Sequence, residues 1–112
     1  MMSKQIKQKR LHDNIYLTKR PLIKESFKFL LKEILRSSKN FNSILDIGCS
    51  NGSFLYLVKK KMPKVEINGI DVRVDLLKLA KQNCKKGAFL KLDIGKNNLK
   101  VKKKLKFDIC VM

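Results

Sequence analysis

The chain has 112 residues, enough for one small domain around a single core, and its composition of 44% hydrophobic and 32% charged residues fits a globular protein rather than a disordered one. No apolar run approaches the roughly 20 residues that cross a bilayer, and no apolar segment follows the basic N-terminus as it would in a secretion signal. We therefore expect a cytoplasmic protein with no membrane span.

The net charge of +18 is compatible with binding to nucleic acid, because lysines that neutralise phosphates release counterions and raise affinity. Only four of the 27 basic residues are arginine, which makes bidentate contacts to phosphates and bases better than lysine does. The abundance of Lys, Asn and Ile also fits a compositional bias, so we favour a solvated basic surface. An RNA-binding or RNA-methylating module stays open as the alternative.

The cysteines and the histidine do not form a recognisable metal-binding pattern. Cys49, Cys84 and Cys110 are far apart and odd in number, and His12 is the single histidine. None of them has the Cys/His spacing of a metal site. We expect reduced, structural thiols and no metal ion.

The N-terminal region, residues 1–42, is predicted to be a basic arm followed by an amphipathic helix. Residues 1–20 are polar and show no period, whereas apolar residues recur at three- and four-residue steps from Pro21 onward. Pro21 suits the first helical position and Glu25 the first turn. The apolar residues of this helix are Leu22, Ile23, Phe27, Leu30, Leu31, Ile34 and Leu35.

Strand and helix patterns then alternate along the rest of the chain. The predicted strands cover residues 43–47, 65–70, 88–94 and 107–112. The predicted helices cover residues 53–61 and 74–86, and the second should face inward through Val74, Leu77, Leu79 and Ala80. This alternation predicts an α/β fold, a Rossmann-like three-layer sandwich with a mostly parallel sheet of about four strands, preceded by the N-terminal helix.

The apolar strand predicted at residues 107–112 is the last part of the sequence. Parallel strands are usually covered on both faces, and an exposed strand edge favours association. We therefore expect residues 43–112 to be the N-terminal half of a longer domain. Alone, it should self-associate through this fourth strand or be an inactive fragment.

The segment LDIGCSNGSF, residues 45–54, joins the first predicted strand to a helix through a loop of small residues. Gly48 and Gly52 let the backbone approach a ligand closely and turn without steric cost. A dinucleotide site would need glycine in place of Ser50 and Ser53. The loop therefore favours a different nucleoside ligand.

Three carboxylates fall at the carboxyl ends of predicted strands, where open α/β sheets bind their ligands: Asp46, Asp71 and Asp93. Asp46 would repel a pyrophosphate but attract the cationic S-adenosylmethionine. Asp71 is placed to accept both ribose hydroxyls of that compound, and Asp93 to accept its adenine amino group. We expect S-adenosylmethionine as the cofactor.

Four segments together resemble the class I S-adenosylmethionine-dependent methyltransferases, across roughly residues 43–112. LDIGCSNGSF is similar to their first motif, INGIDVR to their second-strand signature, LKLDI to their adenine-side motif and FDICVM to the start of their fourth strand. The resemblance implies the N-terminal half of a domain that transfers a methyl group to an acceptor. No nucleic-acid motif is present, so a small-molecule or glycan-type acceptor is preferred, and no catalytic base can be assigned.

The resemblance also implies which residues surround the cofactor. Four of them border its methionine part: Asp46, Gly48, Cys49 and Gly52. Four others border its adenosine part, with Asp71 on the ribose: Asp71, Val72, Asp93 and Ile94. Ser50 departs from the family pattern, which often has glycine at this position.

A structural interpretation stands beside each of these assignments. Asp46 could orient the loop through backbone N–H groups, and Asp71 could cap the helix that follows it. Asp93 could be a solvated turn residue. Cys49 is expected to serve as a small side chain rather than as a nucleophile.

Overall fold

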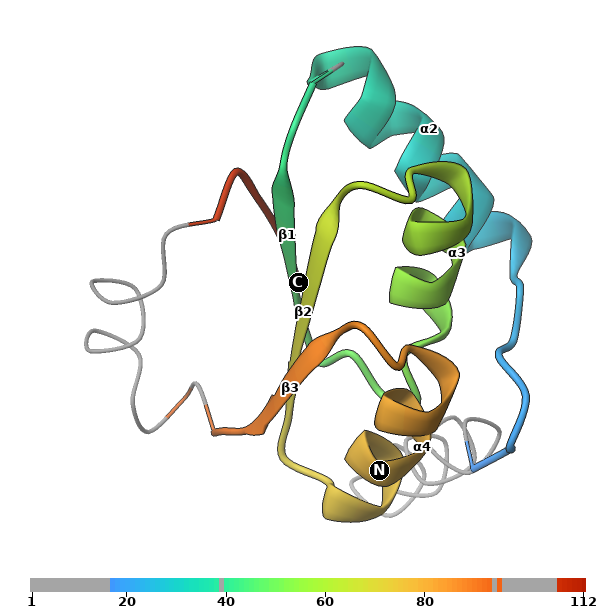
Figure 1. Ribbon diagram of the computed structural model, residues 1–112, viewed down its shortest axis with the longest axis vertical. Helices are drawn as coiled ribbons and strands as arrows, with labels where there is room; N and C mark the ends of the chain where they lie inside the picture. Colours follow the sequence, from blue (N-terminus) through green and yellow to red (C-terminus); the bar gives the residue numbers. More distant parts are fainter. Residues whose placement is uncertain (1–16, 39, 94, 96–106) are drawn as a thin grey trace, which may run out of the picture.

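The computed structural model of the protein describes residues 17–38, 40–93, 95 and 107–112 (Figure 1). Its elements follow the predicted alternation of helices and strands. In chain order they are α2 (Glu25–Ser37), β1 (Ser43–Ile47), α3 (Ser53–Lys61), β2 (Glu66–Asp71), α4 (Val74–Asn83), β3 (Ala88–Lys91) and β4 (Ile109–Val111).

The strands form one parallel sheet in the order β3-β2-β1-β4. Ile44 of β1 pairs with Ile67 of β2 on one side and with Ile109 of β4 on the other. Figure 1 shows the three described helices on the same face of this sheet, so the described residues contribute a sheet layer and one helical layer. The prediction of a Rossmann-like α/β fold with an incomplete parallel sheet is confirmed.

The core lies between that face of the sheet and helices α2, α3 and α4. Ile44, Leu55 and Val58 are fully buried, and Ile67 is nearly so. Side chains alternate across a strand, so Asp46 lies on the same face of β1 as Ile44, at the carboxyl end of the strand. Packing of the core therefore places this carboxylate under the helices.

Helix α2 begins at Glu25, four residues later than predicted from Pro21. Lys24 has an extended backbone, with φ −87° and ψ 150°. The backbone N–H of Leu22 donates to Ser53 Oγ at 2.8 Å, a hydrogen bond between segments 31 residues apart. That tertiary bond replaces the first helical turn, so the prediction that the helix starts at Pro21 is wrong.

The inward face of α4 also differs from the prediction. Leu76, Leu77 and Ala80 are buried, whereas Val74 is 46% exposed. The helix ends at Asn83 rather than at residue 86. These differences arise because α4 packs against β2, β3 and α3 together, and the direction of that packing is not encoded in the helical period.

Both edge strands are shorter than predicted. β3 ends at Lys91, so the predicted extension to Ile94 is not observed, and residue 94 itself lies outside the described part of the chain. At the other edge, Asp108 holds β4 beside β1, accepting from the backbone N–H of Asn42 at 2.7 Å and donating its own N–H to Ser43 Oγ at 3.1 Å. Self-association through β4 stays a prediction.

Among the helices of the described residues, none has both the length and the apolar character needed to cross a membrane.

Candidate functional site

The loop from Gly48 to Gly52 connects β1 to α3 and turns through left-handed backbone conformations. The φ angles are +81° at Gly48, +54° at Ser50 and +79° at Gly52. Glycine adopts such angles without steric cost, which explains the two glycines of the segment. Ser50 adopts the same region as a non-glycine residue, at the position where the related pattern often has glycine.

Gly48 presents open backbone to the carboxyl edge of the sheet. The N–H groups of Gly48 and Cys49 both donate to the carbonyl of Ile70, at 2.7 and 3.0 Å, and so fix the loop to the end of β2. A Cβ atom placed on Gly48 would meet no protein atom within 4 Å. The space above this glycine is therefore free for a ligand.

Gly52 instead faces protein. A Cβ atom there would lie 3.2 Å from both the Cα and the Cβ of Ala80 in α4. We expect Gly52→Ala to lower the free energy of unfolding by about 1–3 kcal/mol, because it combines a left-handed alanine with overpacking. Urea denaturation of the chain measures this difference.

Gly48→Ala is the matched control for Gly52→Ala. It introduces the same left-handed alanine with no packing conflict, so the decrease in its free energy of unfolding should be only about 1 kcal/mol. Equal decreases in the two variants would contradict a packing role for Gly52.

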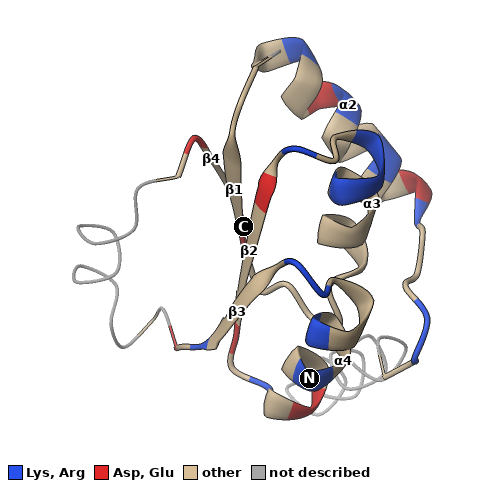
Figure 2. Cartoon of the chain, viewed as in Figure 1, with Lys and Arg blue, Asp and Glu red and all other residues tan. Residues whose placement is uncertain are grey.

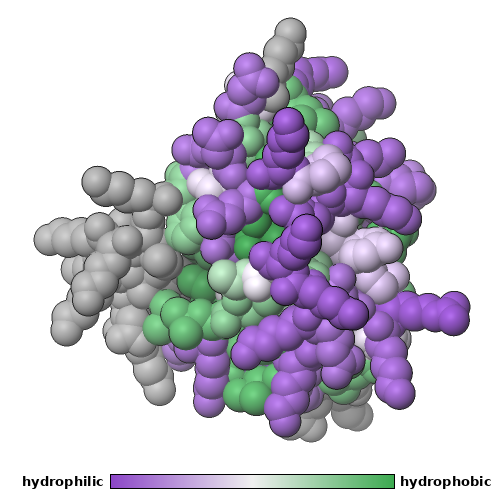
Figure 3. All heavy atoms as spheres, viewed as in Figure 1, coloured by the Kyte–Doolittle hydropathy of each residue, from purple (hydrophilic) through white to green (hydrophobic). Residues whose placement is uncertain are grey.

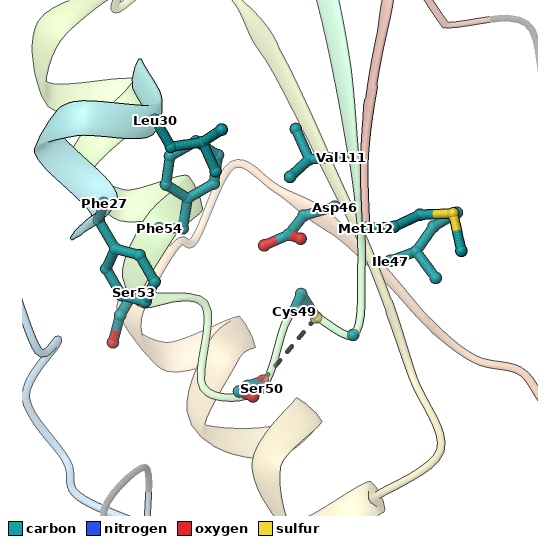
Figure 4. Close-up of a pocket in the computed structure, with 11 residues that line it drawn as sticks. Phe27, Leu30, Asp46, Ile47, Cys49, Ser50, Ser53, Phe54, Val111 and Met112 are labelled. Carbon is teal, nitrogen blue, oxygen red and sulfur yellow. Dashed lines mark hydrogen bonds between the residues drawn. The ribbon is translucent and has the colours of Figure 1, made fainter. Parts of the chain in front are cut away.

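Asp46 is buried beside the loop. Its side chain is 7% exposed and borders a cavity of about 230 Å³ that is also lined by Phe27, Leu30 and Phe54. Figure 4 shows the carboxylate directed into the space between the phenylalanines and the loop. Burial, and secondarily the charge of Asp71, raises the pKa of Asp46 to about 7.

Asp71 ends β2 and holds two backbone segments. Its Oδ2 accepts from the N–H of Ser50 at 2.9 Å, and its Oδ1 accepts from the N–H of Arg73 at 2.9 Å. A carboxylate offers about four lone-pair sites, so these two bonds leave acceptor capacity for a ligand. The same side chain can thus organise the loop and bind hydroxyl groups.

Asp71 and Asp93 share a second hollow of about 200 Å³ with Val72, which is 53% exposed. The Oδ1 of Asp93 accepts from the N–H of Gly95 at 3.0 Å, as in a turn. The remaining predicted site residue, Ile94, lies outside the described residues. The second hollow therefore gathers three of the four residues expected around adenosine.

The three carboxylates predicted at the carboxyl ends of the strands are divided between these two hollows. Both hollows are lined by Ile47 and Gly48, where they meet. Each is smaller than the roughly 300 Å³ at which ligand pockets usually begin, but together they fall within that range. An elongated ligand that crosses Gly48 would contact Asp46 at one end and Asp93 at the other.

Cys49 has the environment of a structural thiol. It is buried, and burial together with the charges of Asp46 and Asp71 raises the pKa of the thiol above its ordinary value. The thiolate needed for nucleophilic chemistry is therefore disfavoured.

The neighbour of Cys49 is Gly69, where a Cβ atom would lie 2.6 Å from the Cys49 sulfur. Sequence reasoning missed Gly69, although a glycine inside a predicted strand is a sign of close approach.

A buried polar network behind the loop was also missed. Asn51 Oδ1 accepts from the N–H and from the hydroxyl of Ser53. Asn83 of α4 donates to the carbonyl of Asn51 at 2.9 Å, and Leu22 donates to Ser53 Oγ. The bonds from Leu22 and Asn83 fix the N-terminus of α3 from two sides, and no local sequence signal reveals these two bonds, because their partners are remote in the chain.

A parallel sheet with a glycine loop after β1 and a carboxylate ending β2 defines a nucleoside-binding domain of the Rossmann-like class. Residues 38–112 match the family described as methyltransferase domain, so the chain belongs to that family. This match confirms the family resemblance predicted from the four sequence segments.

The similar proteins are longer than this chain. A carboxy-S-adenosyl-L-methionine synthase from Campylobacter hominis is 36% identical over 62 residues, which are 55% of this chain and 26% of that protein. The structure of CalS10, an amino pentose methyltransferase from Micromonospora echinaspora with S-adenosylmethionine bound, has a TM-score of 0.62 at 19% identity, over 79% of this chain and 36% of that one. The plantazolicin methyltransferase BpumL, in complex with S-adenosylhomocysteine, has a TM-score of 0.57 at 25% identity, over 76% and 32%. The chain thus spans about a quarter to a third of these relatives.

Proposed function

We propose that the chain binds S-adenosylmethionine across Gly48 and forms the cofactor-binding part of a methyltransferase. The observation that carries this proposal is the arrangement around Asp71. This carboxylate is held by Ser50 and Arg73, keeps acceptor sites for two ribose hydroxyls, and lies beside open loop backbone. The cofactor predicted from the sequence is also the compound bound to CalS10.

The methionine end of the ligand is assigned to the cavity of Asp46, which Gly48 and Cys49 of the loop also line. Gly52 faces Ala80 of α4 and shapes the loop without lining this cavity. A buried carboxylate whose pKa is near 7 is poorly stabilised on its own. A sulfonium or ammonium group brought into this cavity would favour its ionised form. The electrostatics therefore support a cationic ligand over a diphosphate.

The adenosine end is assigned to the hollow of Asp71, Val72 and Asp93. Val72 is exposed there and offers an apolar surface for the adenine ring. Asp93 accepts one backbone hydrogen bond and can accept another from the adenine amino group. Ile94 is assigned to the same ring from its position in the LKLDI segment.

Bound S-adenosylmethionine supplies an electrophilic methyl group, so the protein has mainly to orient the cofactor and exclude water. Phe27 and Phe54 line the cavity with ring centroids 5.7 Å apart and form an apolar wall beside Asp46. Their position supports exclusion of water from the methionine end. We assign no catalytic base to the described residues.

We also propose a small-molecule or glycan-type methyl acceptor. BpumL, at 25% identity, is a plantazolicin methyltransferase, which supports an acceptor of the small-molecule kind. The Campylobacter hominis relative is named for synthesis of a carboxylated S-adenosylmethionine. Cofactor binding is the property that the names of these relatives have in common, and it is therefore the first to test.

Isothermal titration calorimetry of the chain with S-adenosylmethionine and with S-adenosylhomocysteine tests the cofactor assignment. We expect saturable binding of one molecule of each, and no binding of NAD+, because the loop lacks the glycines of a dinucleotide site. A folded sample that binds NAD+ as tightly as S-adenosylhomocysteine would contradict the proposal.

A further inference from the structure

A second groove lies on the helical face of the sheet, and no residue that lines it also lines either hollow of the cofactor site. It has a volume of about 350 Å³ and runs between the C-terminal ends of α3 and α4. Its lining comprises Tyr56, Lys59, Lys60, Ile67, Gln82, Asn83, Cys84, Lys85 and Lys86. The volume is that of a small-molecule pocket, and none of these residues takes part in the proposed cofactor site.

The groove is strongly basic because the fold joins two lysine pairs that are 25 residues apart in sequence. Lys59 and Lys60 come from α3, while Lys85 and Lys86 come from the turn before β3. Figure 2 shows basic segments in α3 and in the turn between α4 and β3. In the described part of the chain, none of the four lysines makes an ion pair.

The nearby acidic residue, Glu66, does not neutralise this groove. Successive residues of a strand point to opposite faces of the sheet. Ile67 lines the groove, so Glu66 is directed to the other face. The groove therefore keeps its positive charge.

Tyr56 supplies an aromatic surface among these lysines. The residue is half-buried, packs against the core and lines the groove. The ammonium group of Lys60 lies 5.5 Å from the centre of its ring, within cation–π distance. Figure 3 shows hydrophilic side chains crowded over α3 and α4 with small apolar areas between them.

We propose that this groove binds a nucleotide of a single-stranded nucleic acid, with the base stacked on Tyr56 and the phosphates neutralised by Lys60, Lys85 and Lys86. Stacking on an aromatic ring within a basic channel is the usual way in which single strands are bound without sequence preference. The exposed amide of Gln82 can hydrogen-bond to the base edge. Lys59 is not assigned to a phosphate, because its ammonium group already donates to the carbonyl of Val65 at 2.8 Å.

The concave shape favours a single strand over a membrane surface. The aromatic ring lies in a groove rather than on a protruding tip, so it can enclose a flat base but cannot insert into lipid. The proposal goes beyond the cofactor site and does not depend on it, since no residue lines both sites.

Fluorescence anisotropy with a labelled oligouridylate of about 12 nucleotides tests the proposal, and the matching oligothymidylate distinguishes RNA from DNA. We expect Tyr56→Leu to weaken binding at least about fivefold, and Tyr56→Phe to bind within about twofold of the wild type, because only the first removes the stacking surface. Lys85→Ala with Lys86→Ala should lower the salt slope of the affinity by about 0.7 for each phosphate that is no longer neutralised. Preference for either oligonucleotide supports the proposal and identifies the ligand.

The matched control is Lys19→Ala with Lys32→Ala, which removes two exposed lysines outside the groove. This pair should leave affinity and salt slope close to the wild type. Equal effects of the two lysine pairs, or equal affinities of Tyr56→Leu and Tyr56→Phe, would overturn the proposal. Binding to phosphatidylserine vesicles that depends on Lys85 and Lys86 but not on Tyr56 would also overturn it, in favour of a membrane surface. S-adenosylhomocysteine binding by Tyr56→Leu should be unchanged, which separates this test from that of the cofactor site.

Discussion

Replacing Asp71 with alanine is expected to abolish calorimetrically detectable binding of S-adenosylmethionine and S-adenosylhomocysteine. Hydrogen bonds to a charged acceptor are each worth about 1.5–3 kcal/mol, so removing two ribose hydrogen bonds corresponds to roughly 3–6 kcal/mol. The substitution also removes the acceptors of the Ser50 and Arg73 N–H groups, which loosens the loop that faces the ligand. The affinity is therefore expected to fall at least about a hundredfold.

Two further variants distinguish a direct loss of cofactor contacts from a general loss of folded structure. Asp75→Ala removes a carboxylate of the same charge from the first turn of α4, where it is exposed and pairs with Arg73 at 2.6 Å, and it should bind the cofactor normally. Asp71→Asn keeps one oxygen acceptor for the backbone and should retain the melting temperature better than the alanine variant while still binding weakly. Affinity of Asp71→Ala within twofold of the wild type would remove this residue from the site.

The affinity for S-adenosylmethionine should rise with pH between 5.5 and 7. Burial, and then the charge of Asp71, raises the pKa of Asp46 to about 7 in the free protein, so the carboxyl group is mostly protonated below that value. A cationic ligand favours the ionised form, and the protein must release a proton to bind it. The affinity should therefore increase by up to about tenfold per pH unit and level off near pH 7. Calorimetry in buffers of different ionisation enthalpy measures the released proton.

Asp46→Asn provides the control, since it cannot ionise. Its affinity should be low and independent of pH over this range. A wild-type affinity that is flat from pH 5.5 to 7 would show that no cation is bound beside Asp46.

The same residue gives a stability measurement without ligand. The folded pKa is raised above the unfolded value of 3.8, so the folded state binds more protons and stability falls as pH rises from about 4 to 7. Asp46→Asn should therefore be more stable than the wild type at pH 8, by an amount on the order of 4 kcal/mol at most, and similar to it near pH 4. Denaturant midpoints at the two pH values measure this difference.

Local sequence patterns were sufficient to predict the limits of an element when neighbouring residues mark both its start and its end. β1 and α3 have the predicted limits, because a short apolar run ends at a glycine loop and a helical pattern ends before Pro63. Gly48 and Gly52 were predicted as loop residues because glycine turns without steric cost. The structure confirms this reason, since both glycines have positive φ angles. The start of α2 was not predictable, because it depends on a hydrogen bond from Leu22 to a residue 31 positions away.

The candidate site shows the same division. The sequence placed Asp46, Asp71 and Asp93 at the ends of their strands, and the structure keeps them along one edge. It could not show that Gly69 gives Cys49 room to lie across β2, or that burial raises the pKa of Asp46. Both effects depend on neighbours from other elements.

By itself the sequence determined the family, the alternation of strands and helices, and the residue types at the carboxyl edge of the sheet. Those features are local, since periodicity, turn residues and motifs are each read within a few positions. Only the tertiary structure decided that the edge is divided into two hollows meeting at Gly48, and that distant lysines surround Tyr56 in a second groove. Packing and electrostatics act through space, so the distances that set them come from the fold rather than from the order of residues.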